Sequence, residues 1–156
     1  MLVLLATLIS AGNAAMRYGF DLSSNAWLEL QWYLFALIFL LGAGYTLKHN
    51  GHVRIDVLYG RFSPKARAWI DLLGGLLFLL PMAGLIGWLG WSAFLNSWAI
   101  GETSPDAGGL LRWPIKLAIP VGFGLLFLQG VSEVIKRAAF LAGRLALNEE
   151  RAEEVA

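Results

Sequence analysis

The sequence predicts an all-α, polytopic membrane protein with four transmembrane helices and with both termini in the cytoplasm. Four apolar stretches, over residues 1–15, 27–47, 69–95 and 115–135, are separated by short polar loops. The chain is 58% hydrophobic and 15% charged, whereas soluble domains carry about a quarter charged residues. Because about 20 apolar residues cross a hydrocarbon core of about 30 Å, the last three stretches are long enough to span a membrane. The first stretch is shorter.

The distribution of charge sets the predicted orientation. The loop between the second and third stretches carries one acid, Asp56, and five basic residues: Lys48, Arg54, Arg61, Lys65 and Arg67. Further basic residues follow the fourth stretch, at Lys136, Arg137, Arg144 and Arg151. Because positive residues are retained in the cytoplasm, both segments are expected inside. We predict a single four-helix membrane domain over residues 1–147 and a disordered acidic tail over residues 148–156.

The first stretch is open to other interpretations. Its small residues, at Ala11, Gly12, Ala14 and Ala15, would suit the cleavage site of a secretory signal peptide. Such a signal normally begins with basic residues, however, and this one begins Met-Leu-Val-Leu-Leu. A natural N-terminus upstream of residue 1 would also account for a short first stretch. We expect a retained transmembrane helix.

The second helix and the segment after it are predicted from capping residues and charge. Ser23, Ser24 and Asn25 can cap a helix that begins near Trp27. Residues 52–59 alternate apolar and charged positions and are too charged to cross a membrane, so they predict an amphipathic segment on the cytoplasmic surface. This region forms a predicted interface with anionic lipid, comprising His52, Arg54, Asp56, Arg61 and Lys65.

The third helix has a clear start signal and a face of small residues. Ser63 followed by Pro64 predicts an N-cap and a first helical turn. Ala83 and Gly87 are four residues apart, a spacing that lets another helix approach closely within lipid. Pro81 is expected to kink the helix.

The fourth helix is expected to begin at Trp113 and to continue into the cytoplasm toward Leu147. Residues 101–109, before it, are rich in turn-forming residues. The predicted orientation places this loop on the outer side of the membrane. The charged residues of the outer loop over residues 101–112 are therefore candidates for contacts on that side: Glu102, Asp106 and Arg112.

Glu29 is the most informative ionisable residue, because it lies in the first turn of the second helix. The helix dipole and the free N–H groups of that turn favour a carboxylate. Three interpretations are open: an interfacial acid that snorkels or pairs with Arg17, an intersubunit salt bridge, and a proton relay. Gln129 is strongly polar and lies deep in the fourth stretch, where a hydrogen bond to a neighbouring helix is expected.

Asp71 and Glu133 lie near the cytoplasmic ends of the third and fourth helices. We interpret both as partners in ordinary helix-end ion pairs. The basic residues nearest in sequence are Arg67 for the first acid, and Lys136 and Arg137 for the second.

The sequence offers no candidate for catalysis, a substrate site, a metal or a cofactor. It contains no cysteine, no Ser-His-Asp arrangement, no paired carboxylates within the apolar stretches and no phosphate-binding loop. His49 and His52 flank Asn50 and Gly51, which favour a turn over a haem or metal site. We therefore expect a protein that is not an enzyme and that binds no nucleic acid.

The order of several short motifs resembles the small membrane subunit of tripartite ATP-independent periplasmic (TRAP) transporters. The second helix opens with Trp27 and Glu29. The other matching landmarks are Arg17-Tyr18, Gly42, Gly51-His52-Val53-Arg54-Ile55-Asp56, Leu111-Arg112-Trp113-Pro114 and Ile119-Pro120-Val121-Gly122-Phe123. The resemblance covers nearly the whole chain. Members of this family usually have a longer cytoplasmic N-terminus, and an acidic pair where this chain has Leu28 and Glu29.

The resemblance implies a division of labour within a complex in the bacterial inner membrane. A large membrane subunit would carry the substrate and sodium sites, and a periplasmic binding protein would deliver an organic acid, often a carboxylate. The small subunit would pack against the scaffold of the large one. Its outer loop would contact the binding protein, and Arg17 and Glu29 would shape its outer surface.

Two other functions remain open from the residues alone. A small proton-coupled transporter that works as a homodimer would use Glu29 as its carrier, although such proteins generally need an acid well inside a span. A membrane anchor for a redox or sensor complex is the other. Recovery of the chain with or without a large polytopic partner would discriminate among the three.

Overall fold

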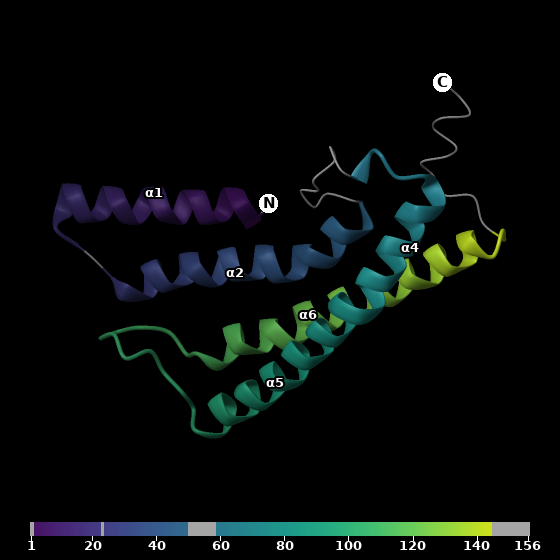
Figure 1. Cartoon of the computed structure of the whole chain (residues 1–156). Helices are drawn as coiled ribbons and strands as arrows, with labels where there is room; N and C mark the ends of the chain where they lie inside the picture. The colour runs from purple at the N-terminus through teal and green to yellow at the C-terminus, as the bar shows by residue number, and fades with distance from the viewer. Residues whose placement is uncertain (1, 23, 50–58, 145–156) are drawn as a thin grey trace.

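The described part of the chain is helical. The computed structural model describes residues 2–22, 24–49 and 59–144. In these ranges the helices are α1 (Leu2–Phe20), α2 (Asn25–Lys48), α4 (Pro64–Gly74), η1 (Gly75–Leu79), α5 (Leu80–Ala99) and α6 (Trp113–Leu141). The elements α4, η1 and α5 follow one another without a break (Figure 1). The predicted all-α class is confirmed for these residues. The predicted amphipathic segment over residues 52–59 and the acidic tail lie almost wholly outside them.

Three of the described helices are long and apolar enough to cross a membrane: α2, the continuous helix Pro64–Ala99, and α6. The helix Pro64–Ala99 has 36 residues. At about 1.5 Å per residue it is longer than a hydrocarbon core of about 30 Å, so it must tilt or extend beyond the core. α1 is not among the three, because Asn13 and Arg17 make its second half more polar.

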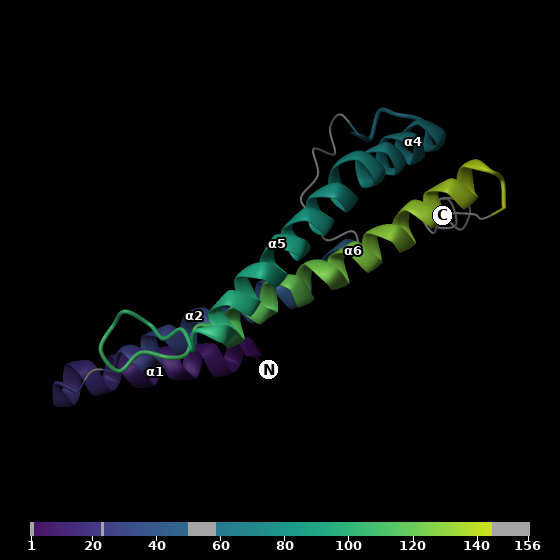
Figure 2. The same cartoon turned by 90° about the horizontal axis from the view of Figure 1, so that it is seen from below.

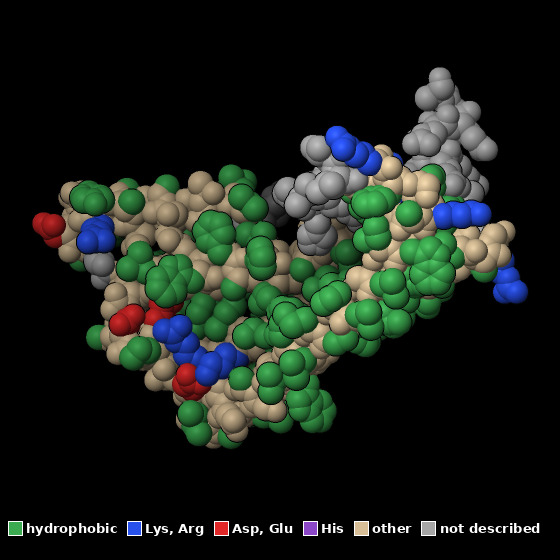
Figure 3. Space-filling view, viewed as in Figure 1, with side chains coloured by type: hydrophobic (Ala, Val, Ile, Leu, Met, Phe, Trp, Pro, Cys, Tyr) green, Lys and Arg blue, Asp and Glu red, His purple; other side chains and the backbone are tan. Residues whose placement is uncertain are grey.

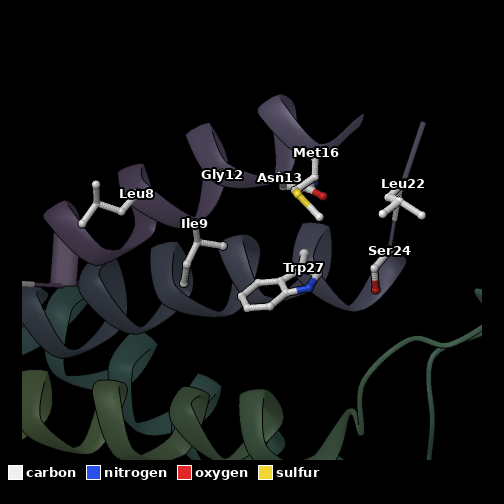
Figure 4. Close-up of a pocket in the computed structure, with 8 residues that line it drawn as sticks. All are labelled: Leu8, Ile9, Gly12, Asn13, Met16, Leu22, Ser24 and Trp27. Atoms are coloured by element: carbon white, nitrogen blue, oxygen red, sulfur yellow. The ribbon is translucent and has the colours of Figure 1, made fainter. Parts of the chain in front are cut away.

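α1 is longer than the sequence predicted. It continues past Ala15 to Phe20, and Arg17 lies in its last turn. The helix packs antiparallel to α2 (Figures 1 and 2). Between the two helices lies a cavity of about 610 Å³ (Figure 4), lined by Leu8, Ile9, Gly12, Asn13, Met16, Leu22, Ser24 and Trp27.

α6 is the centre of the packing, since it contacts α2, α4, η1 and α5. Small residues bring its neighbours close. On α5, Ala83 is buried, and a Cβ atom placed on Gly87 would lie 3.8 Å from Phe123 Cβ. On the opposite side, a Cβ atom on Gly122 would lie 2.8 Å from Leu40 Cβ of α2. The prediction that Ala83 and Gly87 face another helix is confirmed.

The irregularity near Pro81 is a widened helical turn. η1 is a π-helical segment over Gly75–Leu79, and the backbone N–H of Leu80 donates to Gly75 O, five residues earlier. Proline lacks an N–H, and its ring crowds the carbonyl four residues before it. That carbonyl belongs to Leu77, inside η1, so the wider turn is placed where Pro81 disturbs the regular helix.

The predicted start of the third helix is confirmed. Ser63 is the N-cap of α4, its hydroxyl accepts a hydrogen bond from Ala66 N at 3.3 Å, and Pro64 is in the first turn. The cap of α2 differs from the prediction. Ser24 is at the N-cap position, but its side chain makes no capping hydrogen bond.

The fourth helix continues through Lys136 and Arg137 as expected, but it ends at Leu141, short of the predicted extension toward Leu147. Gly143 has a positive φ of 70°. Its N–H donates to Phe140 O at 2.9 Å, and Arg144 N donates to Ala139 O at 3.0 Å. These two bonds form a Schellman motif, which satisfies the last helical carbonyls and ends the helix.

Candidate functional site

Charged side chains of the described helices gather toward the two ends of the molecule. On the face shown in Figure 3, acidic and basic side chains lie toward the ends, and hydrophobic side chains cover the stretch between them. One end holds the loop over residues 100–112, together with the start of α2, and we call it the loop end. The other holds the end of α2, α4 and the end of α6, and we call it the opposite end.

At the loop end, Glu29 is the hub of a buried polar cluster. Its side chain is 3% exposed. Oε1 accepts a hydrogen bond from the Ser104 hydroxyl and lies 3.4 Å from Nη2 of Arg112. Oε2 accepts from the backbone N–H of Leu110 at 2.7 Å. We call these four residues the Glu29 cluster. Through it, Glu29 holds both arms of a loop that is about 80 residues away in the sequence. Glu29 lies just past the first turn of α2 and not in it as predicted, because the helix begins at Asn25.

The loop presents these donors because its two arms pair like a short hairpin. Ser104 N donates to Leu110 O at 2.9 Å, and Arg112 N donates to Glu102 O at 2.8 Å. Gly109 leaves room for the carboxylate: a Cβ atom there would lie 2.4 Å from Ser104 Cβ and 3.0 Å from Glu29 Oε1. Any side chain at this position would collide with the cluster.

Two further side chains of α2 fasten the loop. Asn25 Nδ2 donates to Ala107 O at 3.1 Å, and the Tyr33 hydroxyl donates to Leu111 O at 2.8 Å. Residues 25, 29 and 33 are four apart, so they lie on one face of the helix. The loop is therefore held along two turns of α2.

Glu102 is held by α6 instead. Its carboxylate forms an ion pair with Lys116. This hydrogen bond from Lys116 lowers the pKa of the Glu102 carboxyl below its ordinary value. Asp106, at the tip of the loop, is exposed.

The interpretation of Glu29 as a partner of Arg17 is wrong, since the structure pairs Glu29 with Arg112. Arg17 lies in the last turn of α1, with its guanidinium carbon 6.0 Å from the ring centre of Tyr18. The sequence reasoning missed Ser104, which carries no charge. A usable signal was present, because the predicted orientation puts Glu29 and Arg112 on the same side of the membrane.

At the opposite end, the chief polar contact joins two helices. Asp71 Oδ2 of α4 lies 3.2 Å from Nη2 of Arg137, and the Tyr59 hydroxyl donates to the same oxygen at 2.8 Å. The Arg137 side chain is 8% exposed. Arg67 instead donates to Gly60 O and to Phe62 O. In these contacts Asp71 therefore pairs with Arg137 and not with Arg67, the basic residue nearest in sequence.

Glu133 has the expected partner. Its Oε1 accepts from Lys136 Nζ at 2.6 Å and from Gln129 Nε2 at 2.9 Å. The expectation that Gln129 bonds to a neighbouring helix is wrong, because this bond lies within α6. Glu133 lies four residues after Gln129, one helical turn away, so it satisfies the amide within the same helix.

The residues of the predicted lipid interface fall into two groups. Arg61 and Lys65 are exposed at the start of α4. His52, Arg54 and Asp56 lie outside the described residues. Within the described residues, no group of three or more His, Asp or Glu side chains could hold a metal ion.

Comparison with known proteins identifies the family. The family model for the DctQ component of tripartite ATP-independent periplasmic transporters matches residues 6–140. The C4-dicarboxylate TRAP transporter small permease protein DctQ of Pseudomonas aeruginosa is 30% identical over 134 residues, covering 84% of this chain and 61% of that protein. The protein of the same name from Rhodobacter capsulatus is 38% identical over 107 residues, covering 65% of this chain and 45% of that protein.

A third relative is the putative TRAP transporter small permease protein of Haemophilus influenzae, 28% identical over 89 residues, which cover 56% of this chain and 55% of that protein. The matches thus span about half to three-fifths of the length of these relatives. The match to the family model covers most of this chain and includes both the Glu29 cluster and the Asp71–Arg137 pair. The chain therefore belongs to the DctQ family of TRAP transporter components and is a multi-pass protein of the bacterial inner membrane.

Proposed function

We propose that this chain is the small scaffold subunit of a sodium-coupled TRAP transporter that imports organic acids. Carboxylates are the proposed substrates, since two of the relatives are named for C4-dicarboxylates. In this proposal the chain does not bind substrate. It supports a large membrane subunit that moves the substrate, and it helps to dock a periplasmic binding protein.

The observation that carries the proposal is the absence of ionisable side chains from the middle of the apolar stretches. The sequence has no Asp, Glu, Lys, Arg or His over residues 72–101 or 117–132. Ion-coupled transport normally relies on ionisable groups within the membrane. Glu29, the buried acid of α2, holds a loop of its own chain. These features support a stationary role.

We also propose that α1 is the fourth span and that both termini face the cytoplasm. The loop end would then be periplasmic, with exposed Asp106 at the tip of a loop that five contacts to α2 hold in place. Such a fixed loop is suited to docking a protein. Arg61 and Lys65 would face anionic lipid at the inner surface.

Single cysteines can test this orientation, because the chain has no cysteine of its own. We expect a membrane-impermeant maleimide to label Asp106→Cys from the periplasmic side of spheroplasts and Lys65→Cys only after the membrane is opened. A cysteine added before residue 1 should behave like Lys65→Cys, and Leu22→Cys like Asp106→Cys. Labelling of the added cysteine from outside would exclude α1 as a span.

Affinity purification from the native membrane tests the function. We expect the tagged chain to bring down a larger polytopic subunit, and the reconstituted complex to take up a C4-dicarboxylate only with a sodium gradient and a binding protein. A strain that lacks this chain should lose uptake and regain it with the wild-type gene. Recovery of the chain only as a homodimer, with uptake intact without the larger subunit, would contradict the proposal.

A further inference from the structure

The opposite end also contains a half-open cavity, to which the contacts described above assign no role. Its volume is about 310 Å³. It lies where α4 passes into η1 and approaches α6, and the last turn of α2 closes one side. The lining residues are Leu47, Ile70, Asp71, Gly74, Gly75, Leu79, Gly130, Glu133, Val134 and Arg137. We call this space the opposite-end cavity.

Glycines give the cavity its shape. A Cβ atom on Gly75 would lie 2.8 Å from Val134 Cγ2, so this residue must be small where η1 meets α6. A Cβ atom on Gly130 would likewise lie 3.0 Å from Leu79 Cδ2. Gly74 differs, because a Cβ atom there would meet nothing within 4 Å. The helices therefore meet at one edge of the cavity and leave open space beside Gly74.

The charged groups of the cavity have hydrogen-bonding capacity left over. The ion pair of Arg137 with Asp71 uses Nη2, which leaves Nε and Nη1 of a guanidinium whose side chain is 8% exposed. Glu133 accepts both of its hydrogen bonds at Oε1, so that Oε2 is left without a donor among the described residues. Unused donors and an unused acceptor thus border one space.

The balance of charge indicates what kind of ligand fits. Among the described residues, Asp71 and Glu133 offset Arg137 and Lys136, the lysine paired to Glu133. A simple anion would approach two carboxylates, and a simple cation would approach two basic groups, so neither is favoured. A ligand with both signs of charge fits better, because its phosphate can accept from the arginine and its ammonium group can donate to the glutamate.

We propose that the opposite-end cavity binds the headgroup of a zwitterionic aminophospholipid, such as phosphatidylethanolamine. Its apolar walls, Leu47, Ile70, Leu79 and Val134, would contact the upper part of the acyl chains. The inference rests on the proposed function in one respect: the cavity must lie at the level of the cytoplasmic headgroups. Binding there would fix the junction of α4 and η1 against α6.

The test measures lipid binding by the full-length chain, purified with whatever partners it retains. Native mass spectrometry would compare phosphatidylethanolamine, phosphatidylcholine and phosphatidylglycerol with identical acyl chains. We expect phosphatidylethanolamine to bind about tenfold more tightly than either of the others, since only its ammonium group donates hydrogen bonds and balances the glutamate. Equal binding of the three lipids would overturn the proposal.

Two variants locate the site. Glu133→Gln keeps the side-chain shape but removes the charge, and should abolish the preference for phosphatidylethanolamine over phosphatidylglycerol, which lacks a cationic group to balance the glutamate. Gly74→Leu should fill the cavity and weaken binding about tenfold or more. Gly42→Leu is the matched control, because its Cβ atom also meets nothing within 4 Å and it does not line the cavity. Equal losses in Gly74→Leu and Gly42→Leu would place the lipid elsewhere.

The outcome is separable from that of the proposed function. Lipid selectivity is read from the chain itself, whereas the function is read from co-purification and uptake. Selective binding without a large partner would leave this inference standing and remove the scaffold role. Uptake by a complex that shows no lipid selectivity would support the scaffold role and overturn this inference.

Discussion

Replacing Glu29 with alanine is expected to release the loop over residues 100–112 from α2. The change removes the acceptor for Ser104 and for the backbone N–H of Leu110, and leaves Arg112 without its ion-pair partner. The main cost falls on the half-buried Ser104 hydroxyl and Leu110 N–H, because a donor that loses its acceptor away from bulk water is left unsatisfied. Arg112 is 24% exposed and still donates to Ser104 at 3.1 Å, so the loss of its partner adds less. We expect the thermal midpoint in detergent to fall by roughly 5 to 10 °C.

Hydrogen exchange gives the sharper measurement. The Leu110 amide should exchange at least about tenfold faster in Glu29→Ala, because its acceptor is gone. Asp106→Ala is the matched control, since this acid lies in the same loop but is exposed and outside the Glu29 cluster. Glu29→Ala combined with Arg112→Ala should lose less stability than the two single changes added together. Unchanged exchange at Leu110 would show that the carboxylate does not hold the loop.

Replacing Gly122 with alanine is expected to disrupt the packing of α2 against α6. The added Cβ atom would lie 2.8 Å from both Leu40 Cβ and Leu40 O, and 3.0 Å from Leu40 C. Two of these atoms belong to the backbone, so a change of side-chain rotamer cannot remove the clash. The helices would have to move apart, which we expect to cost about 1–3 kcal/mol of unfolding free energy.

Gly124→Ala provides the comparison, on the same helix two residues later. A Cβ atom at Gly124 would meet nothing within 4 Å. Both substitutions replace a helical glycine with alanine and so change the intrinsic helix propensity equally. Thermal unfolding of the two variants in the same detergent should therefore isolate the packing term. Equal midpoints would mean that α2 and α6 adjust to the extra methyl group without loss.

The helices were predictable because their signals are local. Apolar length identified α2, α5 and α6, and the pair Ser63 and Pro64 located the start of α4. The end of α6 was misjudged although Gly143 stands in the sequence, because a glycine ends a helix only where the chain adopts positive φ. The π-helical turn before Pro81 had only an indirect signal, since the sequence indicates a disturbed helix but not its form.

The partners of the charged residues were less predictable, because they depend on which helices meet. Sequence proximity favoured Arg17 for Glu29 and Arg67 for Asp71. In the structure these acids pair with Arg112 and Arg137, which belong to the loop before α6 and to α6 itself. Both partners can be identified only when the position of α6 beside α2 and α4 is known.

The separation of Glu29 from its donors also bears on how the chain enters the membrane. Glu29 is synthesised 75 residues before Ser104 and 83 residues before Arg112. An unpaired carboxylate is costly to remove from water, which favours holding the start of α2 at the water boundary while α5 is inserted. The loop, which is synthesised later, would then cover the acid. Glu29 would thus become buried only after the early helices are inserted and the late ones are complete.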